Sequence, residues 1–305
     1  MNVLIVGGTG MIGLNTALHL RDRGHSVTLA ARKAPLLPAH PGSVFSLILG
    51  DFAQGTFTRA DLAPFDAIVF AAGNDPRHMP QGADAEGFYR KTQSEGVPAF
   101  AELARRAGVA RFVQIGSYYH HLRPDLAEHS LYIRSRQLAD ERVRALASAA
   151  FAPVTLNPPS IIGAVPGLPA ERYRKLIEWG RGRRPEIPAT APPGGTNYMS
   201  VRSLAQAVAG ALERGEAGRA YLVGDENLSY RAFFQLFFDL ARNPVRVTTQ
   251  DAEHPLLPDP FIVQGRGNTL AYEPDAGDVA LLNFARGDVR RAVAEIARYI
   301  EEDSA

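Results

Sequence analysis

The stretch "NVLIVGGTGMIG", residues 2–13, decides the fold. A short, mainly apolar run meets three glycines, Gly7, Gly10 and Gly13, and a helical pattern follows at once. In a strand–turn–helix unit the first glycine permits a tight turn, the second lets the backbone approach a pyrophosphate, and the third lets the helix pack close to the strand. The helix N-terminus adds free N–H groups and a positive dipole end. We therefore predict a dinucleotide-binding turn, the alternative being a glycine-rich connection that only joins strand to helix.

Short β-rich runs alternate with longer helical patterns through the first half of the chain. The expected strands cover 2–6, 26–30, 43–49, 66–72, 111–115 and 153–157, and the expected helices cover 11–24, 88–108 and 130–147. This alternation predicts an α/β fold with a Rossmann-type doubly wound parallel sheet and helices on both faces. The nearly continuous apolar strands agree, because parallel strands are buried on both faces.

The pattern changes from about residue 164, where Pro/Gly-rich stretches appear between helical patterns at 200–213, 230–241 and 287–301. We predict a dinucleotide-binding domain over 1–163 and a smaller C-terminal substrate lobe over 164–305, with a segment at about 198–224 returning to the Rossmann core. The helically spaced phenylalanines between 233 and 238 are expected to form one buried helix face.

The composition is that of an ordinary globular protein. The 305 residues carry 33 Lys and Arg against 32 Asp and Glu, so no electrostatic footprint for nucleic acid or an anionic membrane is expected. The absence of cysteine excludes disulfides, thiolate zinc sites and thiol catalysis. The apolar run after Met1 is too short for a signal peptide or a membrane span. We predict a cytoplasmic protein that takes any redox chemistry from a cofactor.

The end of the second expected strand, "VTLAARK" at 27–33, indicates which dinucleotide is bound. Rossmann folds that prefer NAD place an Asp or Glu on the ribose 2′-hydroxyl at this point. Here Ala30 and Ala31 leave room, and Arg32 and Lys33 bring two cations to where a 2′-phosphate would lie. NADP is therefore predicted, the alternative being a solvated pair of surface cations.

The chain resembles the extended short-chain dehydrogenase/reductase superfamily, which includes the NAD-dependent epimerases and dehydratases, over nearly its whole length. The motifs that carry the resemblance are GGTGMIG at 7–13, LGDF at 49–52, FAAG at 70–73, IGS at 115–117, Tyr132 with a cation four residues on, and NPPSIIG at 157–163. The last motif and the stretch 198–224 are closer to the dihydroflavonol reductase and hydroxysteroid dehydrogenase branch than to the nucleotide-sugar epimerases. This likeness implies a small or apolar substrate.

The resemblance also implies a set of cofactor residues. Asp51 is expected to hold the adenine, and the strand end at 71–73 is expected to pass beside the adenosine ribose. Together with the glycine turn and the two cations, the expected cofactor-binding residues are Gly7, Gly10, Met11, Ile12, Gly13, Arg32, Lys33, Asp51, Phe52, Ala71, Ala72, Gly73 and Pro158.

The family's active site combines a Ser or Thr at the end of the fifth strand with a Tyr-x-x-x-Lys on the next helix, which implies Ser117, Tyr132 and Arg136 here. Helix positions four apart share a face, so Tyr132 and Arg136 can point into one cleft. A phenol is a weak acid at neutral pH, and a neighbouring cation favours its anion. The serine holds the substrate oxygen. Tyr118 is the alternative to Ser117 if the alignment shifts by one. The alternative role of Ser117 is a strand-end hydroxyl that only caps local backbone.

Arg136 departs from the family pattern. Arginine keeps the charge and can hydrogen-bond the nicotinamide ribose, but it does not release a proton, so a relay that needs lysine to do so is broken. We therefore expect an NADP-dependent oxidoreductase and keep two alternatives. One is a catalytically impaired dinucleotide-binding sensor or partner module, and the other is a nucleotide-sugar epimerase or dehydratase.

The loop "YYHHLRPDLAEH" at 118–129 is shorter than extended members of the family commonly show. It contains Tyr118, Tyr119, His120 and His121, of which a histidine can serve as an acid or base near neutral pH. The alternative is that these residues lie on a surface loop without a role. No carboxylate or further histidine stands beside them at a recognised ligand spacing, so we predict no metal.

The expected partner is a small-molecule substrate, with neither nucleic acid nor membrane. The helices around 86–106 and 131–147 resemble those through which the family forms a homodimer by a four-helix contact. A monomer in which these helices only cover the sheet is the alternative.

Overall fold

The computed structural model describes residues 1–34, 41–165, 167–168 and 170–302. The chain forms two compact units. The first unit comprises Met1–Pro158, Arg202–Val223 and Pro274–Phe284, and the second comprises Pro159–Val201, Gly224–Glu273 and Ala285–Ala305.

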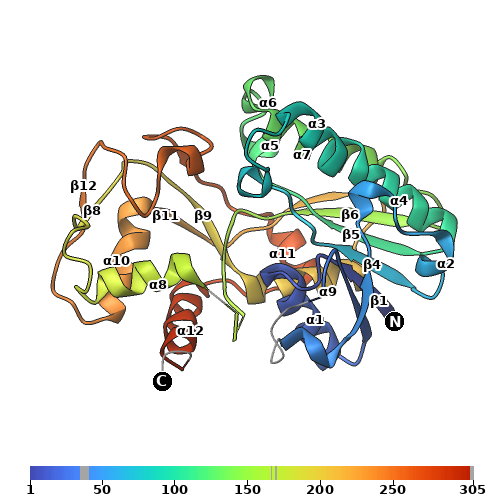
Figure 1. Cartoon of the computed structure of the whole chain (residues 1–305), viewed down its shortest axis with the longest axis horizontal. Helices are drawn as coiled ribbons and strands as arrows, with labels where there is room; N and C mark the ends of the chain where they lie inside the picture. The colour runs from blue at the N-terminus through green and yellow to red at the C-terminus, as the bar shows by residue number, and fades with distance from the viewer. Residues whose placement is uncertain (35–40, 166, 169, 303–305) are drawn as a thin grey trace. The chain divides into compact units, whose positions relative to one another are not determined.

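A seven-stranded sheet forms the centre of the first unit (Figure 1). Its order is β10-β6-β5-β4-β1-β2-β3 and every neighbouring pair is parallel. The strands are β1 (Asn2–Val6), β2 (Ser26–Ala31), β3 (Ser46–Leu49), β4 (Ala67–Phe70), β5 (Arg111–Ile115), β6 (Ala152–Asn157) and β10 (Ala220–Leu222). The chain order reverses between β1 and β4, and in open α/β sheets ligands bind at the carboxyl ends of the strands beside such a reversal. The predicted Rossmann-type sheet is confirmed.

Helices cover both faces of this sheet. Figure 1 shows α1 and α9 on one face and α4 and α7 on the other, and an ion pair of 2.6 Å between Arg23 and Glu213 joins α1 to α9. The helices of this unit are α1 (Met11–Asp22), α2 (Arg59–Leu62), α3 (Ala85–Tyr89), α4 (Gly96–Ala107), α5 (Tyr119–Leu122), α6 (Leu126–His129), α7 (Leu131–Arg144), α9 (Val201–Arg214) and α11 (Ala276–Leu282). Short helical turns add η1 (Pro41–Val44), η2 (Phe52–Gln54), η3 (Pro76–His78) and η4 (Arg90–Ser94).

Two elements differ from the sequence predictions. The strand expected at 43–49 begins only at Ser46, because 41–44 form a 3₁₀ turn. The helix expected at 88–108 divides into α3, the π-helical turn η4 and α4. The π turn places an extra residue in the helix, since the Glu95 N–H donates to the carbonyl of Arg90, five residues earlier, at 2.9 Å.

The described part of the second unit contains two small sheets and three helices. Strand β9 (Gly195–Ser200) pairs with β11 (Glu226–Ser229), β13 (Thr269–Leu270) and β7 (Ser160–Ile162), while β8 (Thr190–Ala191) pairs with β12 (Thr248–Thr249). The helices are α8 (Glu171–Gly180), α10 (Tyr230–Leu240) and α12 (Val289–Glu302), with a 3₁₀ turn η5 (Asp259–Phe261). The predicted phenylalanine face is confirmed, because all four rings of α10 between 233 and 238 are buried in one core with Trp179.

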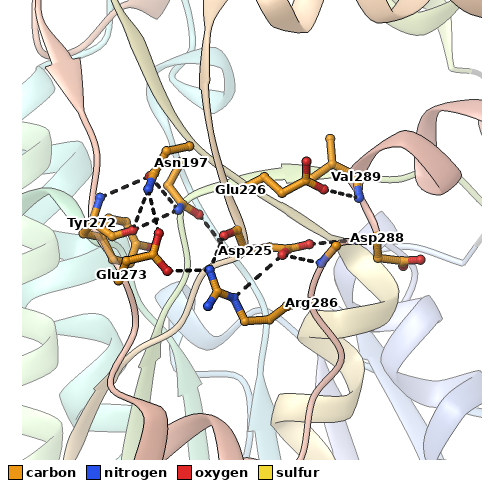
Figure 2. A network of polar contacts seen from close by, with 10 residues as sticks. Asn197, Asp225, Glu226, Tyr272, Glu273, Arg286, Asp288 and Val289 are labelled. Carbon is orange, nitrogen blue, oxygen red and sulfur yellow. Dashed lines mark hydrogen bonds and ion pairs between the residues drawn. The ribbon is translucent and has the colours of Figure 1, made fainter.

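One buried and one half-buried carboxylate hold the start of α12 (Figure 2). Asp225, which is 2% exposed, accepts hydrogen bonds from the backbone N–H groups of Gly287 at 2.6 Å and Asp288 at 3.0 Å. Glu226 accepts from the N–H of Val289 at 3.1 Å. A helix has no internal partners for its first N–H groups, and Glu226 satisfies that of Val289, the first residue of α12. Asp225 holds the two residues before the helix, and both carboxylates favour the positive end of the helix dipole.

We expect Asp225→Asn to lower the free energy of unfolding by about 2 kcal/mol, because one charge-assisted acceptor becomes an amide NH₂ group that faces a buried N–H. The shift in the urea unfolding midpoint measures the effect. Glu273→Gln is the matched control, since the Glu273 side chain is 68% exposed and its pair with Arg286 at 2.7 Å is a surface ion pair. Equal shifts in the two variants would contradict the assigned capping role.

Candidate dinucleotide and catalytic site

The β1–α1 turn is shaped by its glycines. Gly7 has a φ of 78° and donates its N–H to the carbonyl of Ala30 at 3.0 Å. A Cβ on Gly7 would lie 2.8 Å from the backbone nitrogen of Ala72, and a Cβ on Gly13 would collide with the carbonyl of Gly7. Larger residues at these two positions would therefore fill the turn or push α1 away from the sheet. The two glycines therefore keep the turn close to the end of β4 and α1 close to the turn.

Residues of two neighbouring elements lie beside this turn. Met11 and Ile12, both half-buried, form the first turn of α1, which Gly10 precedes as the N-cap. The end of β4 continues into half-buried Ala71 and Ala72 and exposed Gly73. Ala71 donates its N–H to the Val6 carbonyl at 2.9 Å, so the two strand ends lie side by side.

The cations predicted for the 2′-phosphate stand at the end of β2. Arg32 and Lys33 are both exposed, and within the described ranges neither has an ion pair with a carboxylate.

Asp51 and Phe52 follow β3 and have different surroundings. Half-buried Asp51 uses one carboxylate oxygen to accept the N–H of Ala53 at 2.9 Å, which caps η2. The Phe52 ring packs edge-on against Phe70 with centroids 4.8 Å apart. Phe52 is thus a half-buried residue that packs against the core cluster around Phe70.

Ser117 is held at the end of β5 by its neighbour strand. It is 6% exposed, and its N–H donates to the side-chain oxygen of Asn157 at 2.9 Å. A Cβ on Gly116 would collide with the same oxygen, so the glycine allows Asn157 to reach the serine backbone. Pro158, buried, follows directly after Asn157.

The Arg136 side chain joins three elements of the first unit. It is only 7% exposed, and its guanidinium donates to the carbonyl of Ile115 at 2.7 Å, to the carbonyl of Gly116, and to the Gln93 side-chain oxygen at 3.1 Å. Gln93 in turn donates to the carbonyl of Asn74 at 3.1 Å. These partners are all neutral oxygens. The cation therefore fixes α7 to the π turn and to the strand end beside Ser117.

Tyr132 lies one turn before Arg136 on α7 and is half-buried. Its ring packs against Tyr89, with centroids 5.9 Å apart. Burial, together with the neighbouring Tyr132, raises the pKa of Tyr89 to about 12, so Tyr89 stays a neutral phenol. The structure thus places Tyr132 and Arg136 on one helix and ties that helix to the strand end carrying Ser117.

Three residues of this arrangement were missed by the sequence reasoning: Tyr89, Gln93 and Asn157. Asn157 is the first residue of the NPPSIIG motif, so the sequence did contain a signal for this residue. Gln93 is fully buried within the π turn, and π turns are frequent at functional sites, but nothing in the sequence announces the turn itself.

The loop after β5 forms a polar cluster with α7. His120 and His121 both contact the Asp140 carboxylate, which also pairs with Arg144. Burial lowers the pKa of His120. Burial favours the neutral form of Asp140 and would raise its pKa. Hydrogen bonds from His120, His121 and Arg144 outweigh this effect of burial, so the pKa of Asp140 lies well below the usual range. The expectation of no metal rested on the lack of a nearby carboxylate in sequence, and the fold supplies one from another helix.

Within the described residues, no helix combines the length and the apolar character that crossing a bilayer requires.

Comparisons with known proteins agree on the family and the fold. A sequence model of the NAD dependent epimerase/dehydratase family matches residues 3–224. A 3-beta-hydroxysteroid dehydrogenase of Mycolicibacterium neoaurum is 32% identical over 119 residues, which cover 38% of this chain and 31% of that protein. The sterol demethylase protein B of Methylococcus capsulatus is 23% identical over 256 residues, 80% of this chain and 76% of that protein. The chain thus spans about a third of the first relative.

A solved structure shows the same fold. The structure of MoeE5 in complex with UDP-glucose and NAD superimposes with a TM-score of 0.72 at 19% identity, covering 100% of both chains. The family match includes the β1–α1 turn, Ser117, Tyr132 and Asn157, and it extends over more than half of the sequence. The chain therefore belongs to the NAD dependent epimerase/dehydratase family.

Proposed function

We propose that this protein is an NADP-dependent oxidoreductase that transfers a hydride between NADPH and a small or apolar carbonyl or hydroxyl compound. The observation that carries the proposal is the Arg136 clamp, which links the helix of Tyr132 to the strand end at Gly116, next to Ser117. Arg136 and Tyr132 lie four residues apart on α7, and the Arg136 guanidinium lies at the carboxyl end of β5. Ligands of such sheets bind at the carboxyl ends of the strands.

The β1–α1 turn is compatible with a dinucleotide. A Cβ at Gly7 or Gly13 would collide with neighbouring backbone, so the glycines keep the turn tight, and α1 begins directly after it with Gly10 as its N-cap. We assign the pyrophosphate to this turn, the adenosine ribose to the strand end at 71–73, and the adenine to Asp51, with Phe52 and Pro158 contributing backbone contacts. When bound, NADPH supplies the hydride.

The chain's own residues supply the remaining steps. The Ser117 hydroxyl orients the substrate oxygen, and the Tyr132 hydroxyl gives that oxygen a proton as the carbonyl is reduced. Arg136 stabilises the tyrosine anion that remains, through its charge, while its hydrogen bonds keep α7 in place.

The preference for NADPH over NADH is proposed from Arg32 and Lys33, both exposed at the end of β2. We expect Arg32→Ala to weaken NADPH binding about 10- to 100-fold and to leave NADH binding nearly unchanged, because it removes one charge-assisted phosphate contact. Calorimetric titration of both cofactors measures this. Arg59→Ala, which removes an exposed arginine from α2, is the control for general charge. Equal wild-type affinities for the two cofactors would end the proposal of NADP preference.

The substrate class is proposed from the relatives. The hydroxysteroid dehydrogenase and the sterol demethylase protein act, by their names, on apolar ring compounds. A nucleotide-sugar substrate is the alternative, which binding of a uridine diphosphate sugar would support.

A second function, a dinucleotide-binding protein without turnover, is favoured by one observation. The two terminal nitrogens of the Arg136 guanidinium donate to Ile115, Gly116 and Gln93, and the side chain is buried. Loss of NADPH absorbance against a panel of carbonyl compounds distinguishes the two functions, since the sensor would bind NADPH and consume none. We also propose a homodimer through α4 and α7.

A further inference from the structure

Two imidazoles and one carboxylate converge where α5 meets α7. The Nε2 atom of His120 lies 3.1 Å from the Oδ2 atom of Asp140, and the Nε2 atom of His121 lies 3.3 Å from the same oxygen. One ligand atom from each of the three residues lies within 4.8 Å of the other two. His120 and His121 are consecutive, so one turn of helix presents both rings, whose centroids are 4.1 Å apart.

These distances suit a cation with tetrahedral coordination. Zinc binds imidazole nitrogen and carboxylate oxygen at about 2.0–2.2 Å, which puts neighbouring ligand atoms roughly 3.3–3.5 Å apart. The two distances to Asp140 are close to this spacing, and only the two imidazole nitrogens must approach each other. Two nitrogens and one oxygen also match zinc's preference between soft and hard donors.

We propose that His120, His121 and Asp140 form a site for a divalent zinc ion, with water as the fourth ligand. Arg144 supports the site, because its Nε donates to the other carboxylate oxygen of Asp140 at 2.7 Å and leaves Oδ2 for the metal. The Asp140 side chain is fully buried, and that of His121 is 28% exposed, which gives the ion a way in.

The surrounding charge limits the affinity of the site. Asp140 contributes one negative charge, whereas Arg144 pairs with it directly and Arg136 lies close enough to act on His120. Without metal, the same three ligands form a hydrogen-bonded clasp between the loop and α7. A measurement of zinc binding therefore distinguishes a metal site from a purely hydrogen-bonded clasp.

The test uses the full chain without an affinity tag, treated with a chelator and titrated with zinc chloride in a calorimeter. We expect one zinc per chain. His121→Ala should weaken zinc binding at least about tenfold, since even groups that only orient ligands contribute 10- to 100-fold. His129→Ala is the matched control, because His129 is an exposed histidine on α6 outside the cluster, and it should bind zinc like the wild type.

Thermal unfolding gives a second measurement that needs no turnover. Zinc should raise the midpoint of the wild type and of His129→Ala, and it should do so much less for His121→Ala. Asp140→Asn should also lose the zinc-dependent rise, provided that its circular dichroism spectrum remains native. Absence of zinc binding by the wild type, or equal binding by His121→Ala and His129→Ala, would overturn the proposal in favour of the clasp.

Discussion

Tyr132→Phe is expected to reduce turnover by about 10²- to 10⁴-fold while NADPH binding stays nearly unchanged. The substitution removes only the hydroxyl, which we assign as the proton donor to the substrate oxygen. The ring remains, so its packing against Tyr89 at 5.9 Å is kept. A loss confined to kcat, with an unchanged cofactor dissociation constant, identifies an interaction made in the transition state.

Tyr89→Phe is the matched control for this experiment. Tyr89 is 5% exposed, packs against Tyr132 and has a pKa raised to about 12, mainly by burial, so its hydroxyl is unsuited to proton transfer. We expect its removal to change the rate by less than about tenfold. Similar losses in both variants would mean that the ring pair, and not the Tyr132 hydroxyl, supports turnover.

The fold could be predicted because its signals are local. Strand β1 and helix α1 are adjacent in sequence, and their change of period at the Gly7 turn can be recognised without any distant contact. The same holds for α10, whose phenylalanines repeat at helical spacing. The divided helix at 88–108 could not be predicted, because the π turn inserts one residue without a characteristic sequence.

The site could be predicted only in part, for a related reason. Gly7, Ser117 and Tyr132 belong to short motifs that can be recognised in the sequence, although Arg136 replaces the expected lysine and the loop between Ser117 and Tyr132 is short. Gln93 and Arg136 form a hydrogen bond although they lie 43 residues apart in the sequence, and so do Asp140 and His120, which lie 20 residues apart. Such pairs depend on how α7 packs against η4 and α5, and a pattern within one segment carries no information about that packing.

Arg136→Met is expected to reduce turnover at least about 100-fold and to lower the free energy of unfolding by about 2–4 kcal/mol. The methionine keeps an apolar stem of similar length but removes the charge and every donor. Buried oxygens of Ile115, Gly116 and Gln93 then lose their charge-assisted partner, and each such hydrogen bond is worth about 1.5–3 kcal/mol without being additive. Urea unfolding and NADPH oxidation measure the two effects separately.

Arg136→Lys separates the charge of this residue from its geometry. A lysine ammonium is a compact point charge with three donors, whereas the guanidinium reaches the two carbonyls of β5 and Gln93 at once. If Arg136 acts on Tyr132 through its charge, the lysine variant should keep turnover within about tenfold of the wild type and lose mainly the contact to Gln93. A lysine variant as inactive as Arg136→Met would instead show that the position of α7, fixed by the guanidinium fork, limits the reaction. In that case Gln93→Ala, which removes the Arg136–Gln93 hydrogen bond, should also slow turnover although the Arg136 charge remains.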